Sequence, residues 1–524
     1  MVMPDYDIIV IGAGINSLTT AALLGKAGKK VLELEARHQV GGMASTVEFT
    51  PGFKCNIIYD HNQWIDPRLL KKLDLEQHSL ELKYPSILRT TLNQNGEHLR
   101  FYRDPSQTAQ SISHHSGKDA DNWISFTEQI SKLTQFLEAI YAVTPPSLPN
   151  IGLEEALSLR SLTKPIFKQG SRGLVNFMRV VPMMMPELMD EWFESDLLRG
   201  ALATAGIQRI TQGPFSAATG LNFLHQHVHC KGVIHNAHFI KGGTWQLANS
   251  LQKAALEAGV EIRLNTEVSA ITTDNGFCKG IITNEGESIT ADKVVSGLDP
   301  HSTCLKLVGA KNLSPVFRTQ LNNIKFLGST ARIHFALKEL PSIKGIQSDN
   351  MDSIFAIAPS MEYLERAYDC AKYGRISENP YIEFSIPSIQ NPKFAPEGKQ
   401  VLSASVQYVP YHLRVEDWNV ELKKKVSEIV ISILEKYSPG ITELIEHSEV
   451  MTPIDFESKL GLTEGNLNHG EMTLDQFFFM RPTISSAQYQ TPIKNLFLCG
   501  PGTHPGGGLH GANGVNAALE ILKG

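Results

Sequence analysis

The stretch DIIVIGAGINSLTTAALLGKAGKKVLELEARHQVGG, residues 7–42, decides the fold of this chain. It begins with an apolar run rich in β-branched residues, which is typical of a strand buried on both faces. Gly12 and Gly14 then let the backbone turn sharply and approach a ligand closely. A helix to about Ala27 and a second strand from Lys30 to Glu35 follow. This order of strand, glycine turn, helix and strand predicts a dinucleotide-binding unit.

The helix and the second strand carry two further signals. Asn16 and Ser17 are predicted to cap the helix, whose free N–H groups form an anion site suited to a pyrophosphate. Glu35 stands 21 residues after Gly14, where a carboxylate can accept hydrogen bonds from a ribose. Ser17 replaces the third glycine of the usual motif, and its small side chain still permits close helix–strand packing.

The residues after Glu35 carry a resemblance to a known family. Ala36-Arg37, followed by Gly41-Gly42-Met43-Ala44, resembles the flavin-binding extension of the amine oxidase and phytoene desaturase superfamily. The resemblance implies FAD rather than NAD, with the second glycine pair near the FAD pyrophosphate. Together, the motifs and the resemblance predict these cofactor contacts: Gly12, Gly14, Ile15, Asn16, Glu35, Ala36, Arg37, Gly41, Gly42, Met43, Ala44, Val268, Ser296, Gly500, Gly511, Ala512 and Asn513.

A second glycine-rich stretch, CGPGTHPGGGLHGANG, occupies residues 499–514 near the C-terminus. A buried strand is predicted before it and a short helix after it. Crowded glycines are suited to a place where backbone meets a flat ligand. We expect the N–H groups of Gly511 to Asn513 to face the flavin and to favour its anionic reduced form. The motif G-x-G-T-H-P-G-G-G resembles the phytoene desaturase-like branch, which includes flavin-type β-carotene ketolases.

Length and composition limit the classes of protein. The chain has 524 residues, 42% of them hydrophobic, and a net charge of −6, which gives no reason to expect nucleic acid as a partner. We expect no signal peptide, and no apolar run reaches the ~18 residues that span a bilayer. The six cysteines form no C-x-x-C pair, which favours a reducing compartment. We expect a cytoplasmic protein and leave a peripheral membrane contact open; the sequence does not predict the oligomeric state.

The fold class predicted is α/β, with a Rossmann-like FAD-binding domain of the glutathione reductase type and an inserted mixed α+β substrate domain. Residues 1–85, 235–310 and 485–524 are assigned to the FAD-binding domain. Residues 86–234 and 311–484 are assigned to the substrate domain, since the alternating α/β rhythm is lost near residue 85.

Several histidines are candidates for the active site. His61 follows the segment that the resemblance places near the flavin ring, and His504 and His510 lie in the C-terminal glycine stretch. A packing role is an equal alternative for His61. His225, His227 and His229 alternate, so they would share one face of a predicted strand. No carboxylate or cysteine completes a tidy ligand set there, and we expect no metal site.

Residues 173–193 gather five methionines, Met178, Met183, Met184, Met185 and Met189, around two prolines that would kink a helix. One interpretation is the apolar mouth of a substrate channel at a membrane surface. The alternative is a buried helix pair, because methionine commonly fills gaps in cores.

The resemblance implies an FAD-dependent oxidoreductase that desaturates, isomerises or ketolates an apolar isoprenoid or other lipid-like substrate by hydride transfer to flavin N5. No nucleophile–base pair is found, and oxidation by positioning needs none. Two alternatives stay open. One is a flavin amine oxidase, and the other is a non-catalytic lipid-binding or regulatory protein on the same fold.

Overall fold

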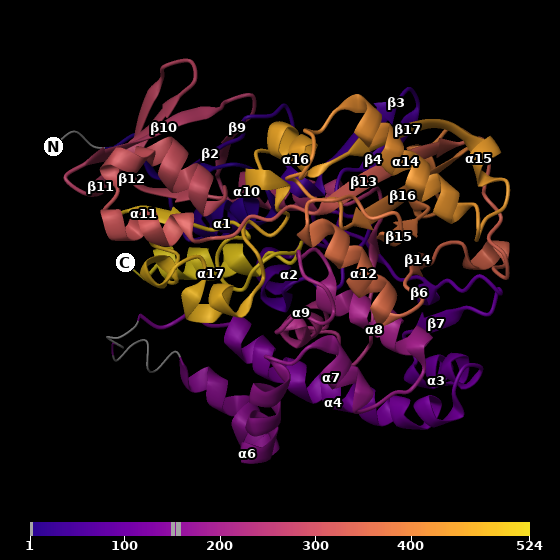
Figure 1. Cartoon of the computed structure of the whole chain (residues 1–524). Coiled ribbons are helices and arrows are strands. Elements are labelled where there is room, and N and C mark those ends of the chain that lie inside the picture. The colour runs from indigo at the N-terminus through magenta and orange to yellow at the C-terminus, as the bar shows by residue number, and fades with distance from the viewer. Residues whose placement is uncertain (1–3, 148–151, 153–158, 524) are drawn as a thin grey trace.

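The computed structural model describes residues 4–147, 152 and 159–523. Two seven-stranded sheets lie side by side, with a layer of helices along one side of the second (Figure 1). Both ends of the chain lie beside the first sheet. Within the described part of the chain, we find no helix with the length and apolar character needed to cross a membrane.

The first sheet has the predicted parallel core. Its parallel strands run in the order β18, β12, β1, β2 and β9, and an antiparallel hairpin of β10 and β11 extends the outer half of β12. The bounds are β1 (Tyr6–Ile11), β2 (Val31–Leu34), β9 (Glu261–Arg263), β10 (Val268–Asp274), β11 (Phe277–Thr283), β12 (Ser288–Ser296) and β18 (Leu496–Leu498). All six residues of β1 are buried or half-buried, as expected for a strand covered on both faces.

Helices cover both faces of this sheet. On one face, α1 (Ile15–Lys26) packs between α10 (Trp245–Glu257) and α17 (Ala512–Ile521). On the other face, a π-helical segment, His301–Gly309, packs against β10, and α11 (Pro315–Asn322) packs against that segment. The carboxyl ends of β1 and β2 therefore open at one edge of a sheet that has helices on both faces.

The second sheet is almost wholly antiparallel, with the order β17, β13, β16, β15, β14, β6 and β7. Its strands are β6 (Ile87–Thr91), β7 (Leu99–Tyr102), β13 (Thr330–Leu337), β14 (Ile354–Ile357), β15 (Tyr381–Ser385), β16 (Gln400–Gln407) and β17 (Ile445–Met451). Two small ladders complete the strands: β3 (Thr46–Thr50) with β4 (Phe53–Asn56), and β5 (Leu82–Lys83) with β8 (Phe239–Ile240).

The remaining helices are α2 (Pro67–Leu73), α3 (Pro105–Ser113), α4 (Gly117–Tyr141), α6 (Thr163–Val180), α7 (Met185–Asp190), α8 (Asp196–Ile207), α9 (Thr219–Gln226), α12 (Met361–Lys372), α13 (Pro387–Gln390), α14 (Val420–Leu434), α15 (Ile441–Leu444) and α16 (Pro453–Leu460). Most of them, from α3 to α9, form the layer below the second sheet, whereas α14 and α16 lie above it (Figure 1) and α2 packs against α1 and α17. A separate apolar core fills this layer, with Trp123 and Phe126 of α4 at its centre.

The strands of the first sheet come from segments 1–85, 235–310 and 485–524, and those of the second from 86–234 and 311–484. The fold class is thus as predicted, while the division into two independent domains stays a prediction.

The sequence prediction was wrong about the histidine strand. Residues 219–226 form helix α9, and His229 takes a left-handed backbone with φ +59°. The three side chains therefore diverge: His225 contacts Tyr141, His227 contacts the carbonyl of Phe223, and His229 lies 3.8 Å from Glu138. Among the described residues, no cluster of three metal-ligating side chains is found.

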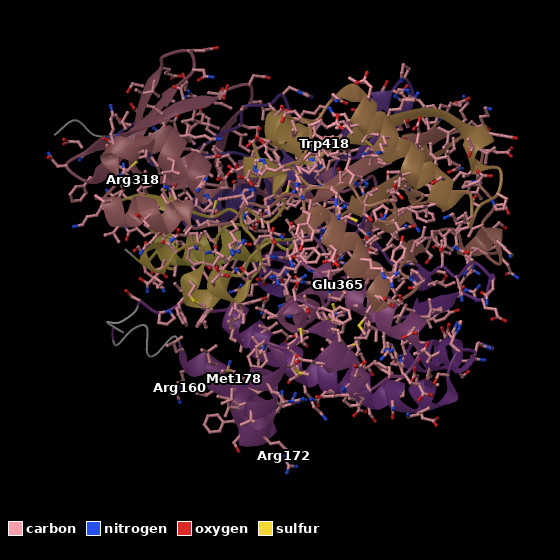
Figure 2. All side chains as sticks on the ribbon, viewed as in Figure 1. Arg160, Arg172, Met178, Arg318, Glu365 and Trp418 are labelled. Carbon is pink, nitrogen blue, oxygen red and sulfur yellow. The ribbon has the colours of Figure 1, made fainter. Side chains whose placement is uncertain are left out.

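The methionine stretch divides between core and surface. Met185 and Met189 of α7 are fully buried, and Met183 and Met184 are half-buried. Met178 of α6 is 63% exposed. Figure 2 shows Met178 and Arg172 on α6 at the outer edge of the molecule, with the Arg172 side chain extending away from the body.

Candidate functional site

A cavity of about 470 Å³ opens at the carboxyl ends of β1 and β2. It continues past the hairpin strand β10 toward the C-terminal glycine stretch, where Gly508 and Leu509 form its wall. Eleven of the predicted cofactor contacts line it: Gly12, Gly14, Ile15, Asn16, Glu35, Ala36, Arg37, Gly41, Gly42, Met43 and Val268.

The two N-terminal glycine turns pack against each other at the mouth of α1. Gly12, Gly41 and Gly42 have φ values of +86°, +120° and +57°, which L side chains rarely adopt. A Cβ on Gly42 would lie 3.2 Å from the Cα of Gly14. A Cβ on Gly14 would meet no atom within 4 Å, so the space in front of this glycine belongs to the cavity.

The start of α1 differs from the prediction in its cap. Gly14 is the N-cap, and no side chain caps the helix. Ser17 cannot reach the first turn, because its hydroxyl lies against Gly297 and 3.9 Å from the Cys499 sulfur. The first N–H groups of α1 therefore have no side-chain acceptor and face the cavity, as an anion site requires.

Glu35 is held at the end of β2 by the glycine turn itself. Its Oε2 accepts a hydrogen bond of 2.8 Å from the N–H of Ala13, and its Oε1 accepts one of 3.1 Å from the N–H of Arg37. Carboxylate oxygens have about four lone-pair positions between them, so acceptor capacity remains for a ribose. The carboxylate lies 9% exposed on the cavity wall.

Six predicted contacts lie behind the cavity wall. They are Ala44, Ser296, Gly500, Gly511, Ala512 and Asn513, and their neighbours Gly297 and Pro501 line the cavity instead. The start of α17 is engaged with protein atoms. The N–H of Ala512 donates to His510 Nδ1 at 3.1 Å, and the Asn513 amide donates to the Thr503 carbonyl at 2.9 Å.

One side of the cavity was not predicted from the sequence. Residues 458–462, at the end of α16, and Lys306 of the π-helical segment line it. Lys306 is exposed and brings a positive charge to a cavity with an anion site. No sequence motif marks these residues, and 458–462 fall in the part of the chain assigned to the substrate domain.

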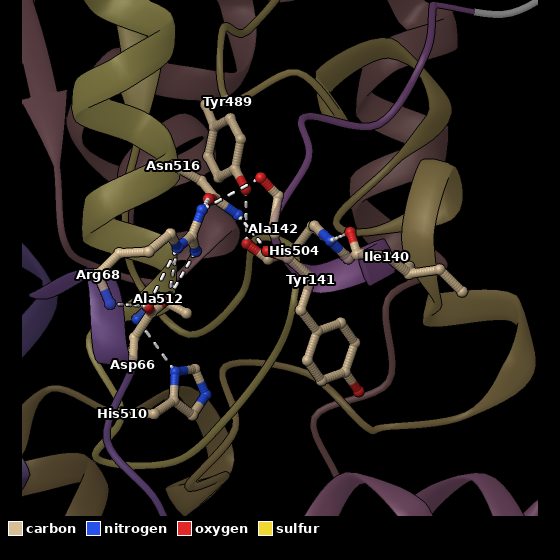
Figure 3. A network of polar contacts seen from close by, with 10 residues as sticks. All are labelled: Asp66, Arg68, Ile140, Tyr141, Ala142, Tyr489, His504, His510, Ala512 and Asn516. Carbon is tan, nitrogen blue, oxygen red and sulfur yellow. Dashed lines mark hydrogen bonds and ion pairs between the residues drawn. The ribbon is translucent and has the colours of Figure 1, made fainter. Parts of the chain in front are cut away.

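His504 and His510 lie in a buried network that fixes the C-terminal glycine stretch (Figure 3). His504 Nε2 lies 3.0 Å from the carbonyl of Ile140, at the end of α4, and Tyr489 donates to the His504 carbonyl at 2.8 Å. Asn516 of α17 donates to the Tyr141 carbonyl and accepts from Arg68 of α2. The network joins α2, α4 and α17 around the stretch.

The carbonyl oxygen of Gly507 accepts hydrogen bonds from two histidine side chains. His225 Nε2 lies 2.9 Å from it, and His510 Nε2 lies 3.1 Å from it. Because a carbonyl oxygen only accepts hydrogen bonds, the Nε2 atom of each histidine carries the proton. The Nδ1 of His225 then accepts from the Tyr141 hydroxyl, and the Nδ1 of His510 accepts from the N–H of Ala512. Both imidazoles are thus neutral, and burial lowers the pKa of His225 to about 4. We assign both to positioning the stretch.

His61 faces a second, smaller cavity, whose lining includes Tyr59, Arg209 and Glu383. Its Nε2 lies 3.7 Å from the Glu383 carboxylate, while burial lowers the His61 pKa to about 4. The Arg89 guanidinium, 2.7 Å from Glu383, holds the pKa of that carboxylate down, at about 2 in spite of its burial. His61 is therefore neutral beside an ionised carboxylate, and its low pKa makes it a weak base.

The large cavity fits a dinucleotide on the residues present. The open space at Gly14, the uncapped start of α1 and the fixed Glu35 carboxylate provide a phosphate site and a ribose site. These would hold FAD, whose isoalloxazine ring supplies the electron-accepting chemistry.

The chain is similar to known proteins over nearly its whole length. The family model described as flavin containing amine oxidoreductase matches residues 18–522. The chain is 30% identical to rat (Rattus norvegicus) pyridine nucleotide-disulfide oxidoreductase domain-containing protein 2, over 99% of this chain and 94% of the relative. It is 25% identical to a phytoene desaturase (lycopene-forming) of Paracoccus sp., over 98% and 96% of the two chains. A solved oxidoreductase structure from Methanosarcina mazei superposes with a TM-score of 0.62 at 17% identity, covering 99% and 100%.

Proposed function

The chain belongs to the flavin containing amine oxidoreductase family and is an FAD-dependent oxidoreductase, and we propose that it oxidises a carbon–hydrogen bond of a lipid-like substrate. A phytoene desaturase is among the relatives that match this chain over nearly its full length, and this similarity supports a lipid-like substrate. Bound FAD would take up the hydride from the substrate, and oxygen or a quinone would reoxidise the reduced flavin.

One observation carries the proposal: a cavity of about 470 Å³ runs from Glu35 to Leu509, so it joins the two glycine motifs at opposite ends of the chain. Gly14 leaves open space for a phosphate at one end, and the buried network around His504 and Gly507 fixes the other. A rigid scaffold that holds the cofactor and excludes water provides the positioning that oxidation of an unactivated bond requires.

The experiment is an anaerobic reduction of the purified, FAD-loaded protein. We expect a yellow protein that releases flavin on denaturation, and bleaching of the flavin band by the small molecules extracted from the cells that made it. An amine panel run in parallel tests the amine oxidase alternative, since bleaching by amines alone would replace the lipid-like substrate. A protein that stays colourless with added FAD would contradict the proposal and favour a non-catalytic binding protein.

A further inference from the structure

A small cavity of about 20 Å³ lies between the second sheet and the segment after β4. Two hydrogen bonds connect its neighbourhood to the cofactor cavity. The Asn62 amide donates to the Leu509 carbonyl at 3.1 Å, and the Asn468 amide donates to the Arg209 carbonyl at 2.7 Å. Leu509 and the neighbour of Asn468, His469, line the cofactor cavity. The small cavity therefore lies beside the end formed by the C-terminal glycine stretch.

Charged side chains surround this small cavity, and most are paired. Arg332 lies 2.5 Å from Asp60, and both side chains are at most 5% exposed. Glu383 is paired with Arg89, behind the wall, at 2.7 Å. These two ion pairs cancel in charge.

The positive charge of Arg209 is not balanced by either of these ion pairs. Its guanidinium lies over the ring of Tyr59, 4.5 Å from the ring centroid. Of the side chains and carbonyls that the structure describes, none accepts a hydrogen bond from this guanidinium, whereas Arg89 and Arg332 each have a carboxylate partner. A guanidinium has five N–H donors and never loses its charge in proteins, so the cavity has an excess positive charge with unused donors.

Two uncharged polar groups on the cavity wall are also without partners. The Tyr59 hydroxyl and the Ser385 hydroxyl are buried and make no hydrogen bond, and their residues are 2% and 3% exposed. Buried polar groups in folded proteins are almost always paired, so two unpaired hydroxyls that share a cavity with an arginine are suited to a polar ligand.

The backbone at Arg209 is fixed in a costly conformation. Arg209 has φ +60°, which is uncommon for a residue with a side chain. Gln407 of β16 holds this turn: its Oε1 accepts from the Arg209 N–H at 3.1 Å, and its Nε2 donates to the carbonyls of Ile207 and Ile210 at 2.6 and 3.0 Å. Strain of this kind persists where the surrounding structure maintains it, often at ligand sites.

We propose that this cavity binds a carboxylate of the substrate, with Arg209 as its counter-ion and the Tyr59 and Ser385 hydroxyls as donors. The inference rests on the proposed function and narrows its substrate class from lipid-like molecules in general to those with an anionic end. The volume agrees, because about 20 Å³ accommodates only one or two water-sized atoms, such as the two oxygens of a carboxylate.

The test is calorimetric titration of the FAD-loaded protein with hexanoate, hexanamide and methyl phosphate, which needs no turnover. We expect saturable binding of hexanoate, no binding of hexanamide, and weaker binding of methyl phosphate. Arg209→Gln should weaken hexanoate binding at least tenfold, and Arg209→Lys should weaken it less. Arg318→Gln, at an exposed arginine on α11, is the matched control and should bind as the wild type does.

Equal affinity of the wild-type protein for hexanoate and hexanamide would overturn the inference, and so would an unchanged affinity in Arg209→Gln. Preference for methyl phosphate would overturn the assignment to a carboxylate. If Arg209→Gln does not fold, the wild-type comparison of acid and amide decides. These outcomes are separate from the proposed function, which fails on the absence of flavin or of flavin reduction.

Discussion

The carboxylate of Glu35 accepts a hydrogen bond of 2.8 Å from the backbone N–H of Ala13, so the acidic residue at the end of β2 clamps the glycine turn after β1. Glu35→Ala removes this clamp together with the predicted ribose acceptor. We expect FAD affinity to fall roughly ten- to hundredfold, since a hydrogen bond to a charged group contributes about 1.5–3 kcal/mol. Titration of deflavinated protein with FAD measures the effect.

Glu35→Gln keeps the size and one acceptor oxygen, so its loss of affinity should be smaller. Glu285→Ala, in the exposed turn between β11 and β12, is the control and should leave FAD affinity unchanged. If Glu35→Ala binds FAD as tightly as the wild-type protein does, Glu35 is not a ribose ligand.

The substitution Gly14→Ala should affect cofactor binding without affecting folding. The backbone of Gly14 has φ −75°, which suits alanine, and an added Cβ meets no protein atom within 4 Å. The apo form of Gly14→Ala should therefore melt at nearly the wild-type temperature, while its FAD affinity falls at least tenfold because the methyl group occupies space meant for a phosphate. Differential scanning fluorimetry and FAD titration measure the two effects.

Gly28→Ala is the control that should change stability and leave FAD binding unchanged. Gly28 has φ +82° and lies after α1, away from the cavity. This variant should lose stability through backbone strain, by about 1 kcal/mol, and keep its FAD affinity. A Gly14→Ala variant that binds FAD normally would show that the phosphate lies elsewhere.

The dinucleotide unit was predictable because its information is local. Strand β1, the glycine turn, α1 and β2 follow one another within about thirty residues, and each depends on backbone conformation and apolar spacing that a sequence displays directly. The alternating histidines were misleading because two local patterns overlap there and predict different elements. His225 and His227 match a strand period, yet Leu221, Leu224 and Val228 repeat with helical spacing, and the helical signal is the one that the packing followed.

The small cavity could not be predicted, because its residues meet only through tertiary structure. Tyr59 follows the β3–β4 hairpin, Arg209 follows α8, and Arg332 and Glu383 lie on β13 and β15 of the second sheet. Strand register decides which side chains of β13 and β15 face the cavity, and a one-residue slip would turn them away. The role of the C-terminal histidines was hidden likewise, since His504 contacts the carbonyl of Ile140 on α4, hundreds of residues earlier in the chain.

Acid should destabilise the fold before it protonates most carboxylates. Burial lowers the pKa of eleven histidines: His61, His98, His225, His227, His229, His235, His238, His334, His469, His504 and His510. Unfolded histidines take up protons below about pH 6.5, whereas folded His61 and His225 resist protonation down to about 4. In this window the unfolded state binds more protons, so the free energy of unfolding decreases as the pH falls.

We expect the melting temperature to fall by about 10 °C between pH 7 and pH 5, with little change between pH 7 and pH 8. Glu471 opposes the trend, because burial raises its pKa to about 7, but the histidines outnumber the acids with raised pKa values. Calorimetry of the wild-type protein against His412→Gln, at an exposed histidine, checks the effect, and both should show the same slope. A melting temperature that is flat from pH 8 to pH 5 would contradict it.

The exposed face of α6 is the surface that we propose for membrane contact. Phe167, Val175 and Met178 are 86%, 66% and 63% exposed, and exposed basic side chains lie near them along α6, which kinks at Gly170 (φ +70°): Lys164, Lys168 and Arg172. Exposed apolar side chains with basic side chains among them suit the surface of an anionic bilayer. Within the methionine stretch that the sequence offered as one interpretation of this surface, Met185 is fully buried, and Met183 and Met184 are half-buried.

We therefore expect the protein to float with vesicles that contain an anionic lipid, and to dissociate at high salt as the electrostatic attraction is screened. The double variant Phe167→Asp/Val175→Asp should stay with the soluble fraction while keeping its FAD. Val316→Asp, at a position 69% exposed on α11, is the matched control and should float as the wild type does. Equal flotation of the wild type and the double variant would show that α6 is not the membrane surface, because the apolar contact it offers would be gone.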